Sequence, residues 1–196
     1  FDPTITVNND DLFVGGENAE DDPDLRDRTR GFFLTQARGT EEAIIFGAKT
    51  GPSVKRASLL VDEDTGVGTL FVSDRQGNSN AAMVTAVENV LPEWKSFDSI
   101  INVVGATLAL QAIDISLTLT IGTDQAAIID LVRQSIVSAL NTLNPGDILY
   151  LDLIRSAAKD VDRQRVLQCV INTPAANVAP GTNQVIRTTI DLITTS

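Results

Sequence analysis

The sequence predicts an α+β fold: an N-terminal arm and helix pair, followed by two small α/β sandwich-like units with the element orders β-β-α-β and β-α-α-β-β. Two observations predict it. The spacing of apolar residues changes repeatedly between the helical period and the period of two that is typical of strands. The predicted strands and helices each have one apolar face, and such elements bury their apolar faces against each other in layers. We expect an acidic arm with two tandem helices in residues 1–50, a first unit in residues 51–105 and a second in residues 106–196.

The negative charge of the chain is concentrated at its beginning. The 196 residues include 26 acidic and 15 basic ones, which gives a formal charge of -11, and eight of the acids lie in residues 1–24 without any lysine or arginine. We interpret residues 1–20 as an arm whose order depends on what it lies against. Because negative charge repels phosphate groups, the composition disfavours nucleic acid and anionic membranes as partners.

Two tandem helices are expected after the arm. Asp22-Pro23-Asp24 is typical of a helix start, because aspartate accepts hydrogen bonds from first-turn amides and proline has no N–H to leave unpaired. This helix is predicted to run to about Arg38. Gly39 permits a left-handed end, and Thr40 can cap a second helix that ends at Gly51-Pro52.

The first unit is predicted from a change to strand-like alternation. Residues 54–61 and 69–73 are rich in β-forming residues, and the turn composition of residues 62–66 between them favours a hairpin. Residues 80–91 form the next helix, with Met83, Val87, Val90 and Leu91 on one face. A strand at residues 100–104 completes the β-β-α-β order.

The second unit begins with one long strand, predicted over residues 107–121 from strict alternation with a slip near Ala112 that we interpret as a bulge. The clearest helix of the chain follows at residues 125–143, capped by Thr123 or Asp124. Its apolar stripe is Ile129, Val132, Ile136, Leu140 and Leu143. The remaining elements are a helix and two strands, at residues 150–159, 166–171 and 184–193.

The residue inventory excludes much catalytic chemistry. Without histidine the chain cannot supply a Ser-His-Asp or Cys-His nucleophile pair, a histidine base or a histidine metal ligand. The single cysteine, Cys169, excludes an internal disulfide, a thiolate zinc site and an iron–sulfur cluster. Because it lies in an apolar strand, we expect Cys169 to be a small buried hydrophobic residue. No cofactor and no metal site are predicted.

Several short motifs have a structural explanation. Gly47-Ala48-Lys49-Thr50 lacks the spacing of a phosphate-binding loop, and Gly66-Val67-Gly68 lacks the third glycine of a dinucleotide motif. The acidic clusters Glu20-Asp21-Asp22, Asp62-Glu63-Asp64 and Asp160-Val161-Asp162 are interpreted as a helix cap, a hairpin turn and a turn after a helix. They leave a carboxylate-dependent hydrolase open as an alternative.

Aromatic residues are few, and two groups of them are candidates for an interface. Phe32 and Phe33 are adjacent in the first helix, and Trp94 and Phe97 lie in a connection where a large aromatic residue more often marks an interface. Core packing is the default interpretation for both groups. A carbohydrate- or receptor-binding module is a further alternative, and it requires an exposed aromatic platform around Trp94.

No secretion signal is expected, because the acidic start reverses the usual basic segment. No apolar run approaches the roughly 18–20 residues that a membrane helix needs. The chain begins at Phe1 rather than at methionine, so we expect it to be part of a longer protein.

Four stretches of the sequence carry a resemblance to a known family. They are GGENAEDDPDLRDR with the following ARGT in residues 15–40, GPSVKR in residues 51–56, VSDRQG in residues 72–77 and PAANVAPGTNQV in residues 174–185. Together they resemble the C-terminal region of the baseplate J-like family, whose members belong to the baseplate wedges of contractile phage tails and related injection machines. The connection at residues 92–99 departs from the proline-containing connection of many members.

The resemblance implies an assembly role without catalytic residues or cofactors. Copies would pair, bind other wedge proteins and link neighbouring wedges into a ring around the tail tube. The expected location is the tail baseplate of a virion, assembled in the host cytoplasm. Gly51-Pro52 and Gly105-Ala106 are candidate hinges between rigid units.

Overall fold

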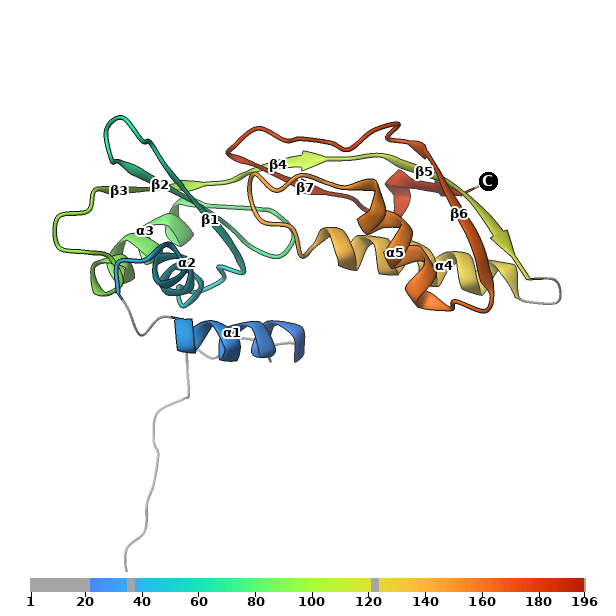
Figure 1. Cartoon of the computed structure of the whole chain (residues 1–196), viewed down its shortest axis with the longest axis horizontal. Helices are drawn as coiled ribbons and strands as arrows, with labels where there is room; N and C mark the ends of the chain where they lie inside the picture. The colour runs from blue at the N-terminus through green and yellow to red at the C-terminus, as the bar shows by residue number, and fades with distance from the viewer. Residues whose placement is uncertain (1–21, 35–37, 121–123, 196) are drawn as a thin grey trace, which may run out of the picture.

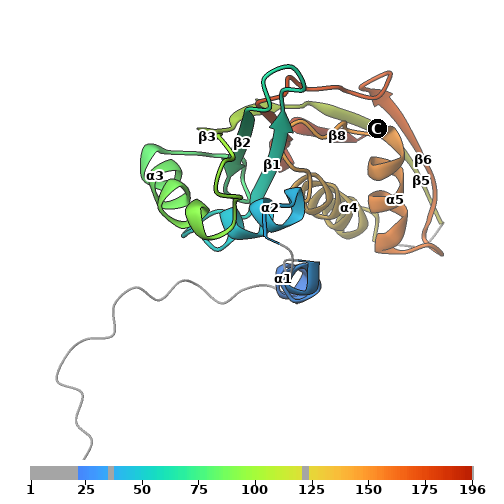
Figure 2. The ribbon, with the colours of Figure 1, turned by 60° about the vertical axis from the view of Figure 1, so that its left-hand side comes forward.

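The computed structural model describes residues 22–34, 38–120 and 124–195, so the expected acidic arm lies outside the described residues. Within them the chain forms five α-helices and eight strands in three small sheets, which confirms the predicted α+β class. Figure 1 shows an elongated arrangement in which the helices lie on one side of the sheets, and Figure 2 shows the same from a second direction.

The helix pair forms as α1 (Asp22–Leu34) and α2 (Glu41–Lys49). Asp22 is the first residue of α1 rather than a cap before it, and Arg38 lies in the turn rather than in the helix. The joint follows the prediction, because Gly39 has a φ of 84° and Thr40 Oγ1 accepts a hydrogen bond from Ala43 N at 3.2 Å.

The first sheet has the predicted β-β-α-β order. Strands β1 (Arg56–Val61) and β2 (Gly68–Ser73) form an antiparallel hairpin, and β3 (Ile101–Gly105) runs parallel to β2 after the crossover helix α3 (Ala81–Val90). A short 3-10 helix (Leu91–Glu93) follows α3, with Pro92 inside it.

Helices α2 and α3 cover one face of this sheet and form the first hydrophobic core. Asn80 caps α3 by accepting a hydrogen bond from Met83 N at 2.8 Å, which sets the helix so that Met83 and Val87 face the sheet. The core residues are Ile44, Ala48, Val54, Ala57, Leu70, Val72, Met83, Val87 and Leu91.

The predicted long strand at residues 107–121 is wrong as a single element. It divides into β4 (Thr107–Leu110) and β5 (Ile113–Leu119), and the slip at Ala112 is the boundary between two sheets rather than a bulge within one. The predicted strand at residues 184–193 divides likewise into β7 (Gln184–Arg187) and β8 (Ile193–Thr195), separated by a 3-10 helix (Ile190–Leu192).

The two divided segments run side by side. Strand β7 pairs with β4, and β8 pairs with β5, both in parallel. Both segments therefore leave the two-stranded sheet and enter the three-stranded sheet at the same point along their length. Strand β5 has β6 (Val166–Thr173) as its antiparallel neighbour on the other side, which gives the sheet order β6-β5-β8.

The second hydrophobic core lies between this sheet and two helices, α4 (Gln125–Leu140) and α5 (Leu151–Val161). Asp124 rather than Thr123 is the N-cap of α4, since its carboxylate accepts from Ala127 N at 3.3 Å. The helix ends three residues earlier than predicted. The buried stripe of α4 is Ile128, Val132, Ile136 and Leu140, so Ile128 takes the place predicted for Ile129.

The structure thus contains two separate hydrophobic cores, and the division of the chain into three parts stays a prediction. Both candidate hinges have packed surroundings. A Cβ on Gly51 would lie 3.2 Å from the Val87 side chain, and one on Gly105 would lie 2.4 Å from Ser79 Oγ. Ser79 Oγ also donates to Ala106 O at 2.8 Å. Motion at either place would have to break these contacts.

Two left-handed glycines differ in what surrounds them. Gly77 has a φ of 88°, and a Cβ there would lie 2.9 Å from both Leu108 and Val185. Gly66 has a φ of 70° with nothing within 4 Å. We expect Gly66→Ala to lower the free energy of unfolding by about 1–2 kcal/mol through backbone strain alone. Gly77→Ala should cost about 1–3 kcal/mol more, because packed side chains must move. Urea unfolding of both variants measures the difference, and equal losses would contradict the packing at Gly77.

Candidate assembly surfaces and the junction between the cores

The buried side chain of Arg187, in β7, connects parts of the chain that are distant in sequence. The residue is 2% exposed. Its guanidinium donates to Leu140 O at 3.0 Å and Leu143 O at 3.0 Å, and also to Arg75 O at 2.8 Å and Ile186 O at 2.7 Å. The last carbonyls of a helix have no backbone donor and carry the negative end of its dipole. A buried cation therefore suits the end of α4.

A second arginine, from the first sheet, binds the same helix end. Arg56 Nε in β1 donates to Asn141 O at 2.8 Å. Burial, and after it the positive charge of Arg56, lower the pKa of Arg187 to about 10, so Arg187 stays charged at neutral pH. We call Arg56, Arg187 and the carbonyls that they bind the arginine junction. It joins the two cores, and sequence reasoning missed it because nothing local marks a surface-type residue for burial.

Trp94 is half-buried against its own chain. Its ring lies 5.3 Å from the Phe46 ring at an interplanar angle of 57°, and the Arg38 guanidinium lies 5.8 Å from the ring centre. A Cβ on Gly47 would come within 2.3 Å of the indole, so glycine is required for the ring to lie on α2. Trp94 O accepts from Gly39 N at 2.9 Å. Trp94 thus packs on α2 and binds the turn that precedes it. It does not form the exposed platform that a carbohydrate-binding module requires.

Of the other aromatic candidates, Phe97 is fully exposed, at 105% of its reference area. It lies in a loop that Lys95 Nζ restrains by donating to Ser99 O at 2.9 Å. An exposed aromatic side chain on a restrained loop is suited to contact with another molecule. Phe32 and Phe33 lie in α1, but their side chains fall outside the described residues. Of the two candidates in the connection, Trp94 is therefore packed on its own chain and Phe97 is exposed.

Other exposed apolar side chains were not singled out by sequence reasoning. Alternation marks one face of a strand as apolar, but it does not say which face a helix covers. Those at least half exposed, besides Phe97, are Leu60, Val61, Ile100, Leu110, Tyr150 and Leu167.

The acidic clusters that the structure describes act in turns. Asp62 Oδ1 accepts from Asp64 N at 2.9 Å and Thr65 N at 3.2 Å, which holds the β1–β2 turn and lowers the pKa of Asp62. Asp162 accepts from Gln164 N at 2.9 Å in the turn before β6. Within the described residues, no group of three or more Cys, Asp or Glu side chains is placed to hold a metal ion. Asp22 lies in α1, and the other two residues of its cluster are outside the described part.

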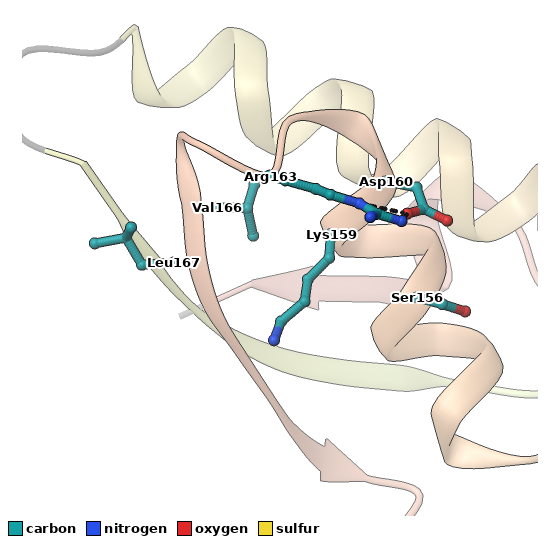
Figure 3. A pocket seen from close by; sticks show the side chains of 6 residues that line it. All are labelled: Ser156, Lys159, Asp160, Arg163, Val166 and Leu167. Carbon is teal, nitrogen blue, oxygen red and sulfur yellow. Dashed lines mark hydrogen bonds and ion pairs between the residues drawn. The ribbon is translucent and has the colours of Figure 1, made fainter.

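An open pocket of about 400 Å³ lies between the end of α5 and the start of β6. Figure 3 shows Arg163 turned toward Asp160, to which Nη2 is bonded at 2.6 Å. The other lining residues are Ser156, Lys159, Val166 and Leu167. With no nucleophile paired to a base among these residues, the pocket does not have the arrangement of a hydrolase site.

Cys169 is 5% exposed in the second core, as predicted for a small buried residue. Burial raises the pKa of its thiol, which disfavours the reactive thiolate. In the described part of the chain, no helix is both long and apolar enough to cross a membrane.

A polar network crosses the three strands of the last sheet on its solvent side. Asp114 in β5 accepts from Thr194 Oγ1 at 2.7 Å and from Asn172 Nδ2 at 3.0 Å. Asn172 Nδ2 also donates to Ser116 Oγ at 2.9 Å. The hydrogen bonds from Thr194 and Asn172 lower the pKa of Asp114. The network connects both neighbours of β5 to it.

Comparison with known proteins gives a likeness in fold. No family model and no curated protein matches the sequence. Among solved structures, the chain is similar to one in the cryo-EM structure of the anti-feeding prophage (AFP) baseplate, 6-fold symmetrised, with a TM-score of 0.52 and 14% identity. The match covers 89% of this chain and 43% of the other, so this chain spans less than half the length of the chain it matches. The architecture described above thus also occurs in a component of a prophage baseplate.

The arginine junction predicts a large effect of one substitution. Arg187→Met should lower the free energy of unfolding by about 3 kcal/mol, because it removes the side-chain donor to the partly buried carbonyl groups of Leu143 and Arg75. Arg165→Met is the matched control: its side chain is 55% exposed and is paired with Asp162 at 3.2 Å, so its removal should cost about 0.5 kcal/mol. Urea unfolding measures both, and similar losses would show that the junction contributes little.

The pKa of Asp114 predicts a dependence on pH. Because the folded state lowers this pKa, the stabilisation is present above the unfolded value and is lost as the pH falls through the folded value. Asp114→Asn should therefore lower the urea midpoint at pH 7 and have a smaller effect at about pH 2.5, which is below the unfolded pKa of aspartate, where the stabilisation decreases. Asp191→Asn, at an exposed position, is the control. An effect of Asp114→Asn that is equal at both pH values would contradict the network.

Proposed function

We propose that this chain is a structural component of a contractile-tail baseplate wedge, and that it links wedge subunits around the tail tube by protein–protein contacts. The observation that carries the proposal is the shared fold over 89% of the chain with a component of the AFP baseplate. The four sequence stretches that resemble the baseplate J-like family support it independently, because they concern the sequence and not the fold.

In this proposal the chain works through its surfaces and not as an enzyme, and it needs no cofactor. Its partners are other copies of itself, paired within a wedge, and other wedge proteins. It is located in the tail baseplate of a virion or related particle and is assembled there in the host cytoplasm. Two cores joined by a buried arginine junction suit a part that must keep its shape while neighbours bind.

Among the aromatic candidates, we assign the contact with a neighbouring protein to Phe97. Its side chain is fully exposed, and the loop that carries it is restrained by Lys95, so little conformational entropy is lost on binding. Phe32 and Phe33 remain candidates in α1. Trp94 contributes by holding the same loop against α2.

Particles that contain this chain test the proposal directly. A cryo-EM map of the baseplate should contain density for the chain in the wedges, and removal of its gene should stop baseplate assembly. Complete particles that assemble without the chain would contradict the proposed function.

Phe97→Ser tests the contact within such particles. The free energy of unfolding should change by no more than about 0.5 kcal/mol, since the side chain touches little of its own chain. Binding to the neighbour should weaken by about 30-fold, the effect of losing an interface residue worth about 2 kcal/mol. The measurement is the amount of variant chain in purified baseplates. Leu167→Ser, which removes another exposed apolar side chain, is the control and should incorporate normally.

A further inference from the structure

One face of the first sheet has no helix on it, and by the strand register it carries the apolar Leu60, Phe71 and Val104 together with the polar Ser58, Thr69 and Asn102. The side chains of Leu59, Leu70 and Val103 point toward α2 and α3, where they form or pack against the first core. Because successive side chains of a strand point to opposite faces, their neighbours in sequence point away from the helices. Figures 1 and 2 show all the helices of the described residues on the same side. We call the apolar residues on the other face the outer patch: Leu60, Phe71, Ile100 and Val104.

The exposure of the outer patch is considerable. Leu60 is 50% exposed, Ile100 62% and Val104 40%, whereas Phe71 is buried, with only 7% of its surface exposed. The strand register places Phe71 opposite Val104, and Ile100 O accepts from Gly68 N at 2.9 Å. The exposed apolar side chains therefore lie on one face of the sheet, with Thr69 and Asn102 between them.

The outer patch ends in negative charge. The β1–β2 turn carries Asp62, Glu63 and Asp64, and no lysine or arginine occurs between residues 57 and 74. Asp62 is used within the turn. Glu63 and Asp64 are exposed and form no ion pair in the described part of the chain. A partner for this surface needs an apolar side chain next to positive charge.

Helix α1 has these properties. Leu25 is 42% exposed, and Arg26 and Arg30, one turn apart, are exposed without an ion pair among the described residues. The acidic residues of the helix, at positions 22, 24 and 27, precede its last two arginines, at positions 28 and 30, so positive charge is concentrated in its second half. The helix rests on α2, where a Cβ on Gly31 would lie 3.1 Å from Phe46. A helix of this length is marginal in water without further packing.

The two surfaces cannot meet within one molecule. Helix α1 lies beyond α2, on the opposite side of the helix layer from the outer patch (Figures 1 and 2). We propose that α1 of one copy packs on the outer patch of a second copy, with Leu25 on the apolar side chains and Arg26 and Arg30 facing Glu63 and Asp64. The added helix gives the sheet helices on both faces, which is a common layer arrangement.

This contact joins different surfaces of the two copies. Such a head-to-tail contact propagates from copy to copy and closes into a ring if the rotation allows it. The proposal specifies the self-contact within the proposed function, and it rests on that function for its setting in a baseplate. It predicts that the chain also associates by itself in solution at sufficient concentration.

A charge-swap experiment on the whole chain tests the contact. One variant carries Glu63→Lys and Asp64→Lys, and the other carries Arg26→Glu and Arg30→Glu. In sedimentation velocity at low salt, each variant alone should associate at least tenfold more weakly than the unmodified chain, because its two surfaces then repel. An equimolar mixture should regain association, since the reversed surface of each variant meets an opposite charge on the other. Glu88→Lys, an exposed change on α3, is the control and should have no effect.

Three results would overturn the contact. The first is an unmodified chain that stays monomeric at about 1 mM, the effective concentration within an assembly. The second is a pair of variants that each associate as strongly as the unmodified chain. The third is an equimolar mixture of the variants that does not regain association. Urea unfolding of both variants should match that of the unmodified chain, which separates loss of contact from loss of fold.

Cysteine crosslinking in particles distinguishes this contact from the proposed function. The single cysteine of the chain is buried, so Leu25→Cys and Leu60→Cys introduce the reactive thiols. A crosslink between residues 25 and 60 of different copies supports the contact. If the chain is present in baseplates and no crosslink forms, the contact is wrong and the proposed function stands. If the chain is absent from baseplates while the charge swap succeeds in solution, the proposed function is wrong and the contact stands.

Discussion

The C-terminal end of α4 is the point on which the rest of the structure depends. Leu140 is buried there, Asn141 and Leu143 are partly buried, and arginines from β1 and β7 donate to the carbonyl groups of these three residues. Arg187 also holds the carbonyl of Arg75 in the loop before α3. One buried helix end thus fixes the first sheet, the pair β4-β7 and the second core relative to one another. Lysine could not replace Arg187, because only a guanidinium offers several donors in a fixed plane.

With this junction in place, the two cores share a common orientation. The helices of both lie on the same side of the sheets, and β3, β4 and β5 succeed one another along the molecule. The arrangement leaves one side of the first sheet, the loop of Phe97 and helix α1 at the surface. Exposed apolar surface of this kind is typical of sites that bind other proteins.

Much of the local structure could be predicted from the sequence. The caps at Thr40 and Asp124 and the left-handed turn at Gly39 follow from interactions within a few residues. The predicted long strands were wrong for a physical reason. Alternation reports which side of a strand is apolar, and this does not change when the strand leaves one partner for another. Segments 107–119 and 184–195 both change partners where the sheets meet, so neither shows the break in its pattern.

The sequence by itself determined the fold class, the type and order of most elements and the exclusion of histidine- and thiolate-based chemistry, because composition, periodicity and short-range hydrogen bonding decide these. Tertiary structure decided the fate of particular side chains. Trp94 and Phe97 are three residues apart in one connection, yet one is packed on Gly47 and the other is fully exposed. Arg187 is buried although arginine is ordinarily a surface residue. For Trp94 and Arg187 the deciding contacts come from residues more than forty positions away, which no local pattern encodes.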